Sequence, residues 1–122
     1  MSRDHQKLAV FDLAQTVVLD IYRLTECLPA TERYGLQSQL RRAAVSTVTN
    51  IVEGCARRSE REYASFVNVA AGSSAETEYL VELSVKLGLL DGGECVAIKD
   101  RLNHLVRSLK ALRNSLEQHT GR

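Results

Sequence analysis

Hydrophobic residues recur every three or four positions along most of the chain, which is the spacing of amphipathic helices. Four segments with this spacing are separated by short turns, and they span residues 7–28, 36–57, 60–87 and 93–118. Pro29 ends the first segment, because proline cannot continue the hydrogen-bond ladder of a helix, and Gly88 ends the third. Ser59 and Asp91 stand where side chains cap helix N-termini. The pattern predicts an all-α protein, folded as an antiparallel up-down-up-down four-helix bundle.

Small residues mark two places where neighbouring helices can approach closely. Gly54 lies near the end of the second predicted helix, where it either terminates the helix or permits a close contact. The run Gly72-Ser73-Ser74 lies in the middle of the third predicted helix, where small side chains leave room for another helix. The sequence therefore predicts close packing of the third helix and leaves both roles open for Gly54.

The chain length and composition are those of a single globular domain. With 122 residues, of which 44% are hydrophobic and 25% are charged, one domain over residues 1–122 can bury a substantial core. No apolar run approaches the roughly 20 residues that cross a bilayer, and the first residues lack the apolar core of a signal peptide. We therefore expect a cytoplasmic protein without membrane association.

The residue types that carry metal or catalytic chemistry show no recognisable arrangement. Cys27, Cys55 and Cys95 lie far apart within apolar runs, so we expect them to be reduced core residues. The chain contains no Cys-x-x-Cys pair, no Gly-x-x-x-x-Gly-Lys loop, and no His-Glu-x-x-His or Gly-x-Ser-x-Gly motif. Its three histidines are scattered. We therefore predict that the protein is not an enzyme and uses no metal, cofactor or small-molecule substrate.

The second predicted helix has a wider apolar face than the core of a bundle requires. On a helical wheel, apolar and small residues of the segment 36–57 cover about 200°, roughly twice the width of one core-facing stripe. The excess lies around Val45, Val48 and Val52. Either a sister subunit covers this flank, or the helix is buried more deeply than its neighbours within one bundle. We favour the first interpretation and predict a homo-oligomer with these valines at the interface.

The opposite flank of the same helix consists of side chains that can form hydrogen bonds. Within about 100° of the wheel lie Gln39, Arg42, Ser46, Thr49, Asn50, Glu53 and Arg57. This polar stripe is either an internal network that fixes the register of the helices or a surface that meets phosphates or a partner. We assign a structural role to Gln39, Ser46, Asn50 and Glu53. The preference for this role is strongest for Asn50 and Glu53, since an acid does not help to bind phosphate. The role of the arginines stays open.

Charged residues are segregated along the chain, although the net charge is only +1. Six basic and three acidic residues lie in 32–61, one and six in 62–98, and six and two in 99–122. This segregation allows either a basic surface that binds nucleic-acid phosphates or pairing between basic and acidic helices. The candidate nucleic-acid-binding residues are Arg41, Arg42, Arg57, Arg58, Arg61, Lys99, Arg107, Lys110 and Arg113.

Several ordered sequence elements resemble a known family. They are Glu32-Arg33-Tyr34-Gly35-Leu36, Gln39-Leu40-Arg41-Arg42-Ala43-Ala44, Ser46, Asn50-Ile51, Glu53-Gly54, Phe66, Ala70, Gly72-Ser73, Glu76 and Leu87-Gly88. Together they are similar to the four-helix bundle proteins encoded in intervening sequences of bacterial 23S ribosomal RNA genes, over roughly residues 8–90. Accessory variability proteins of diversity-generating retroelements share this fold. The chain departs from the family pattern at Thr47-Val48-Thr49, Val52 and Thr77, and its charge is nearer to neutral than that of strongly basic relatives.

The resemblance implies an antiparallel bundle that assembles as a ring of five subunits and binds nucleic acid, or an enzyme acting on nucleic acid, through basic surface. The leading hypothesis is a non-catalytic oligomeric scaffold that binds structured RNA or a nucleoprotein partner, mainly through phosphate contacts. The alternative is a protein-interaction module with no direct nucleic-acid role. The surplus apolar surface and the balanced net charge favour that alternative.

Overall fold

The computed structural model consists of α-helices joined by short connections, and the described residues, 2–119, include no strand. Side chains are described for residue 7 and residues 9–118. The helices are α1 (Ser2–Thr25), α2 (Leu36–Cys55), α3 (Glu60–Lys86) and α4 (Val96–His119), with a 3₁₀ helix, η1 (Ala30–Glu32), between α1 and α2. The predicted all-α class and the four predicted helices are confirmed.

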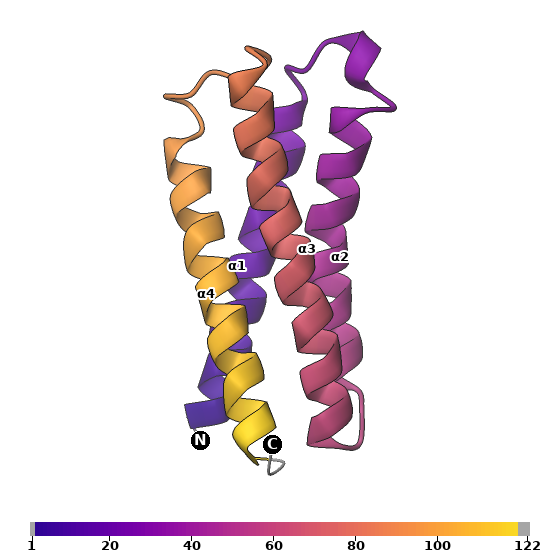
Figure 1. Cartoon of the computed structure of the whole chain (residues 1–122), viewed down its shortest axis with the longest axis vertical. Coiled ribbons are helices and arrows are strands. Elements are labelled where there is room, and N and C mark those ends of the chain that lie inside the picture. Colours follow the sequence, from indigo (N-terminus) through magenta and orange to yellow (C-terminus); the bar gives the residue numbers. More distant parts are fainter. Residues whose placement is uncertain (1, 120–122) are drawn as a thin grey trace.

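The four helices lie side by side as a bundle (Figure 1). α2 packs most extensively against α3, and α3 against α4, while α1 makes smaller contacts with α2 and α4. The start of α1, the end of α4 and the α2–α3 connection lie at one end of the bundle, called the terminal end below. The α1–α2 and α3–α4 connections lie at the opposite end (Figure 1). The start of α3 is therefore close to the end of α4.

Local sequence explains both ends of α3. The Ser59 Oγ atom accepts a hydrogen bond of 3.1 Å from the backbone N–H of Glu62, which caps the first turn. Gly88 follows the helix with a φ of 76°. The next residue, Leu89, donates its backbone N–H to the carbonyl of Ser84 at 2.9 Å, which completes a Schellman motif. Glycine enters this left-handed conformation without the clash that a Cβ atom would create.

The other helix ends differ from the predicted positions by a few residues. α1 begins at Ser2 rather than at residue 7, and it ends at Thr25 because the chain tightens into a turn before Pro29. α2 ends at Cys55 rather than at residue 57. α4 begins at Val96 rather than at residue 93. The Asp91 carboxylate instead caps a separate turn, accepting the Glu94 backbone N–H at 3.0 Å.

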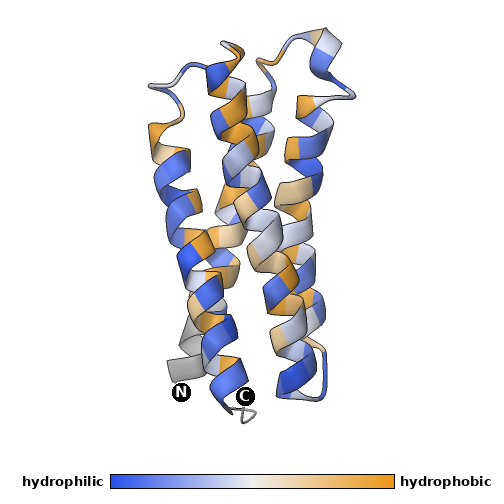
Figure 2. Ribbon diagram, viewed as in Figure 1, coloured by the Kyte–Doolittle hydropathy of each residue, from blue (hydrophilic) through white to orange (hydrophobic). Residues whose placement is uncertain are grey.

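The core contains an unbroken leucine seam on α4. Its members are at most 2% exposed, and they are Leu102, Leu105, Leu109, Leu112 and Leu116. Figure 2 shows the matching alternation of hydrophobic and hydrophilic bands along α4. Small hydroxyl residues are buried opposite, on α2 and α3, and each donates to a carbonyl of its own helix at 2.8–3.1 Å: Thr47, Ser74, Thr77 and Ser84. Because these bonds satisfy the hydroxyls locally, the residues can be buried without an interhelical partner.

The cysteines do not all belong to the core as the sequence predicts. All three are free thiols, but only Cys95 is buried, whereas Cys27 and Cys55 are exposed. Cys27 lies just beyond the end of α1, and Cys55 is the last residue of α2. Neither helix therefore carries its cysteine side chain into the core. The prediction is correct for Cys95 and wrong for the other two, because apolar neighbours in sequence do not fix burial at a helix end.

The thiols are therefore expected to react with Ellman's reagent in two classes. Cys27 and Cys55 should react rapidly, while Cys95 should react slowly, since its side chain is buried and burial raises the pKa of its thiol. The measurement is the time course of thiol release, with a Cys95→Ala variant to identify the slow phase. Three equal rates in the folded protein would contradict this arrangement of the cysteines.

Candidate nucleic-acid and subunit interfaces

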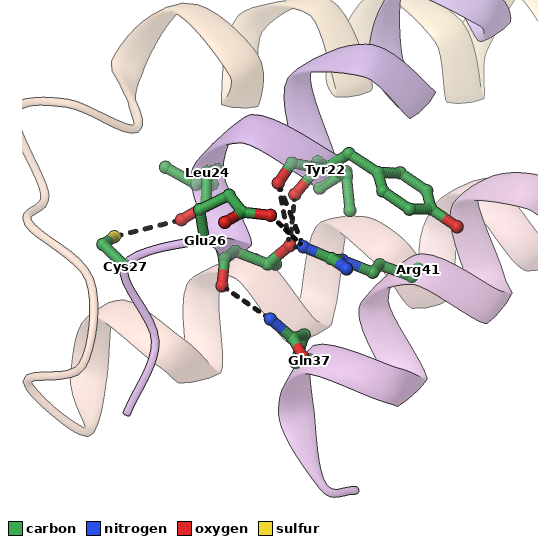
Figure 3. A network of polar contacts seen from close by, with 8 residues as sticks. Tyr22, Leu24, Glu26, Cys27, Gln37 and Arg41 are labelled. Atoms are coloured by element: carbon green, nitrogen blue, oxygen red, sulfur yellow. Dashed lines mark hydrogen bonds and ion pairs between the residues drawn. The ribbon is translucent and has the colours of Figure 1, made fainter. Parts of the chain in front are cut away.

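Arg41 lies in a polar network between α2 and the end of α1. Figure 3 shows its guanidinium directed at the final turn of α1, where Tyr22 and Glu26 lie. Its Nε donates to the Oγ1 of buried Thr25 at 2.9 Å, and its Nη2 contacts the Tyr22 carbonyl and the Glu26 carboxylate at 3.2 Å. Gln37 adds a bond from Nε2 to the Thr25 carbonyl at 3.1 Å. The positive charge also complements the carbonyl end of α1.

This network gives Arg41 a structural role, so we leave it out of the proposed RNA surface. Replacing Arg41 by glutamine is expected to lower the free energy of unfolding by about 1 kcal/mol, because the bonds to the end of α1 are lost. The matched control is Arg42→Gln, which should cost less, since the side chains of Arg42 and its partner Glu76 are 57% and 40% exposed. Urea denaturation of both variants measures the difference. Equal losses would contradict the structural role of Arg41.

The polar stripe of α2 divides between the seam with α3 and the solvent. Ser46 and Ser73 of α3 share a hydrogen bond of 3.0 Å between their Oγ atoms, and Asn50 Nδ2 donates to the Ser46 carbonyl at 2.8 Å and to its Oγ at 3.1 Å. Arg42 forms an ion pair with Glu76 of α3. By contrast, Gln39 and Thr49 are exposed. The central part of the stripe therefore joins α2 to α3, and the remainder faces solvent.

Glu53 and Arg57 form a separate exposed pair near the terminal end. Their side chains are 59% and 44% exposed, and the carboxylate lies 3.6 Å from the guanidinium. Arg57 also stacks on the ring of Phe66 of α3, with 4.8 Å between the guanidinium carbon and the ring centroid. No contact joins Glu53 to Asn50 among the described residues, so a single network through Arg42, Asn50, Glu53 and Arg57 does not form.

The predicted basic residues of α4 fall into two groups. Lys99 lies near the α3–α4 connection, and its ammonium group is 3.7 Å from the carboxylate of Glu82 on α3. Arg107 and Lys110 are exposed and form no ion pair with another described side chain. Arg113, one turn further on, donates to Asn68 of α3 at 3.0 Å. The second group, which starts at the middle of α4 and continues toward its C-terminal end, is therefore the one available to an external anion.

Two more basic residues lie at the terminal end, Arg58 just before α3 and Arg61 in its first turn, which also holds the acidic Glu60 and Glu62. Arg58 and Arg61 are exposed, and Arg61 lines a surface hollow together with Arg113 of α4. Both arginines are predicted from the sequence as basic candidates but not as a pair, because residues 52 positions apart meet only once the helices pack. Asn68 is not among the residues predicted from the sequence. Arg61, Ser65 and Asn68 follow one another at helical steps of four and three residues, and this spacing is the sequence signal that places all three on one face of α3.

The predicted oligomer interface is partly exposed in the single chain. Val52 is 53% exposed, while Val45 and Val48 are half-buried. These valines continue the helical stripe that starts at Arg41, whose side chain contacts α1, so they flank the α1–α2 seam. On α1, Tyr22 borders the same seam, and the guanidinium carbon of Arg41 lies 4.5 Å from the centroid of its ring. Leu19, one turn before Tyr22, is 52% exposed. This flank carries several apolar side chains in contact with solvent.

The described residues hold no group of three or more metal-ligating side chains. No helix within the same residues is long and apolar enough to span a membrane.

Comparisons with known proteins agree on the fold. A family model described as 23S rRNA-intervening sequence protein matches residues 6–111. The chain is also similar to the crystal structure of a protein of unknown function from the S23 ribosomal protein family of Bacteroides thetaiotaomicron VPI-5482. The two share 20% sequence identity and superpose with a TM-score of 0.82, covering 89% of this chain and 98% of the other. A search of curated proteins gives no match.

Proposed function

The chain belongs to the family of 23S rRNA-intervening sequence proteins, and from that premise we propose a non-catalytic oligomeric scaffold that binds structured RNA or a nucleoprotein partner. The proposal includes an antiparallel up-down-up-down bundle, a ring of five subunits and a cytoplasmic location. The observation that carries it is a group of five basic residues, called the basic cluster: Arg58, Arg61 and Arg113 near the terminal end, and Arg107 and Lys110 from the middle of α4 onward. Arg113 is half-buried and shares a hollow with Arg61, and the other four are exposed.

Exposed basic side chains without acidic partners suit contacts with nucleic-acid phosphates. Arg58, Arg107 and Lys110 form no ion pair with another described side chain, so binding a phosphate would not require breaking one. The basic residues toward the opposite end are mostly paired, as Arg42 is with Glu76 and Lys99 with Glu82. Such contacts position a backbone without reading its bases, so the proposed binding depends on RNA shape rather than on sequence.

Assembly of several copies supports binding by a chain of nearly neutral charge. One basic cluster provides only a few phosphate contacts, whereas a ring presents the same cluster several times to one RNA. The exposed apolar side chains beside the α1–α2 seam, Val52 and Leu19 among them, are the proposed subunit interface. Burial of this flank by a sister chain would remove apolar surface from water.

The oligomer is tested by placing a charge on the proposed interface. Val52→Asp is expected to lower the mass measured by light scattering, because a carboxylate would be buried without a partner. Val69→Asp is the matched control, since Val69 of α3 is similarly exposed, at 49% against 53%. Both variants should keep the helical circular-dichroism spectrum. A monomeric wild-type protein at micromolar concentration, or dissociation by the control alone, would contradict the assignment.

RNA binding is tested by its dependence on salt. Four phosphate contacts would reduce the affinity for a labelled RNA hairpin about 100-fold between 50 and 200 mM salt. Fluorescence anisotropy measures the affinity, and the absorbance ratio of the purified protein reports bound nucleic acid. An affinity that does not change with salt would exclude this mode of binding.

The alternative is a protein-interaction module, and one specific observation favours it. Ion pairs between helices neutralise much of the basic surface, as for Arg101 of α4, which donates to Asp20 of α1 at 2.9 Å. Nuclease treatment of complexes captured with the protein distinguishes the two functions. Partners retained after nuclease treatment would favour the module, and partners lost would favour the RNA-binding scaffold.

A further inference from the structure

A polar hollow of about 390 Å³ lies between α3 and α4 near the terminal end. Its lining consists of Arg61, Ala64, Ser65, Asn68, Arg113 and Glu117. Ala64 is 3% exposed, so a small buried side chain lies among the polar ones. Most of the polar groups are hydrogen-bond donors, and the one acidic residue of the lining is Glu117.

Neutral amides orient the guanidinium of Arg113. Its Nη1 donates to the Oδ1 of Asn68 at 3.0 Å, and its Nε and Nη2 donate to the Oδ1 of Asn114 at 3.2 and 3.1 Å. These acceptors hold the group in place without neutralising its charge. Because the amide oxygen of Asn68 faces Arg113, the amide N–H₂ group of Asn68 points away from that contact and can donate to a second acceptor.

We propose that this hollow is a phosphate site, in which Arg61 and Arg113 hold one phosphodiester group of the bound RNA. The inference rests on the proposed RNA-binding function and names the contact through which it acts. Two guanidinium groups from different helices provide planar, paired donors that match phosphate oxygens. Asn68 and Ser65 add neutral donors at the side of the hollow.

The negative charge of Glu117 leads to a second prediction about the affinity for RNA. Its carboxylate opposes an approaching anion, so Glu117→Gln is expected to strengthen binding while loss of either arginine weakens it. Charge-matched variants outside the hollow separate this local effect from a change in net charge, since exposed charges are largely screened beyond about 10 Å at moderate salt.

The experiment measures the affinity of the full chain for a labelled RNA hairpin by fluorescence anisotropy. The variants are Arg61→Gln, Arg113→Gln, their double variant and Glu117→Gln. The control, Arg23→Gln with Lys86→Gln, removes the same charge from exposed positions outside the hollow. Thermal unfolding of each variant checks the fold. Inorganic phosphate and a polyglutamate peptide compete in separate arms, which distinguish phosphate from a protein carboxylate as the preferred anion.

If both arginines hold one phosphate, each single variant should lose about 10-fold in affinity, and the double variant should lose little more. Losses that multiply to about 100-fold would mean two independent contacts and would overturn the single site, although RNA binding would stand. Unchanged affinity in the arginine variants, or stronger competition by polyglutamate than by phosphate, would also overturn the site alone. Absence of RNA binding by the wild-type protein would overturn both the site and the proposed function.

Discussion

Leu109→Ala is expected to lower the free energy of unfolding by about 3 kcal/mol, the largest effect predicted for a single substitution in this chain. Leu109 is 0% exposed and lies in the leucine seam of α4 between Leu105 and Leu112, which are also buried. Truncation would remove the Cγ atom and both Cδ methyl groups from the core. It would also leave a cavity whose walls are side chains of packed helices, and these can collapse only in part.

Leu87→Ala is the matched control for this substitution. It makes the same chemical change at a leucine that is 58% exposed, where few contacts are lost. We expect it to cost less than about 0.5 kcal/mol. Urea denaturation at equal protein concentration compares the two variants, because oligomerisation makes the apparent stability depend on concentration. Similar losses would mean that the α4 seam does not lie in the core.

Helical periodicity was sufficient to predict the all-α class and the four helices because burial follows it closely. On α4 the regularly spaced hydrophobic residues of the predicted segment 93–118 include the buried leucines, since one face of this helix meets its neighbours along its whole length. Periodicity gave less information at the helix ends. Cys27 and Cys55 belong to apolar runs, yet both are exposed, because a helix end need not continue under its neighbours.

The candidate site could be predicted only as a set of residue types. Composition identified the arginines, but whether an arginine is available depends on a partner from another helix, which no local pattern reveals. Arg41 and Arg42 are adjacent in sequence and reach α1 and α3 respectively, because neighbouring positions on a helix point about 100° apart. The pairing of Arg61 with Arg113 depends in the same way on the packing of α3 against α4.

Gly54 of α2 and Gly72 of α3 are expected to respond in opposite directions to the same substitution. Gly54→Ala should destabilise the protein by about 1–2 kcal/mol, because the new Cβ atom would lie 2.8 Å from Tyr63 Cδ1 and 2.9 Å from Phe66 Cβ. The Phe66 Cβ atom is fixed to the backbone of α3, so relief requires that α2 and α3 move apart. Of the two roles that the sequence leaves open for Gly54, the close contact is the one observed.

Gly72→Ala should instead stabilise the protein by about 0.5–1 kcal/mol. A Cβ atom at Gly72 would meet nothing within 4 Å, so the sequence-based expectation of close packing is wrong for this glycine. Alanine would then contribute only its higher helix propensity, which applies fully at Gly72 because this residue lies in the interior of α3. Thermal and urea unfolding of both variants give the sign directly. A stabilising Gly54→Ala would show that α2 and α3 can separate at little cost, and that the extensive packing between them tolerates a shift of the backbone.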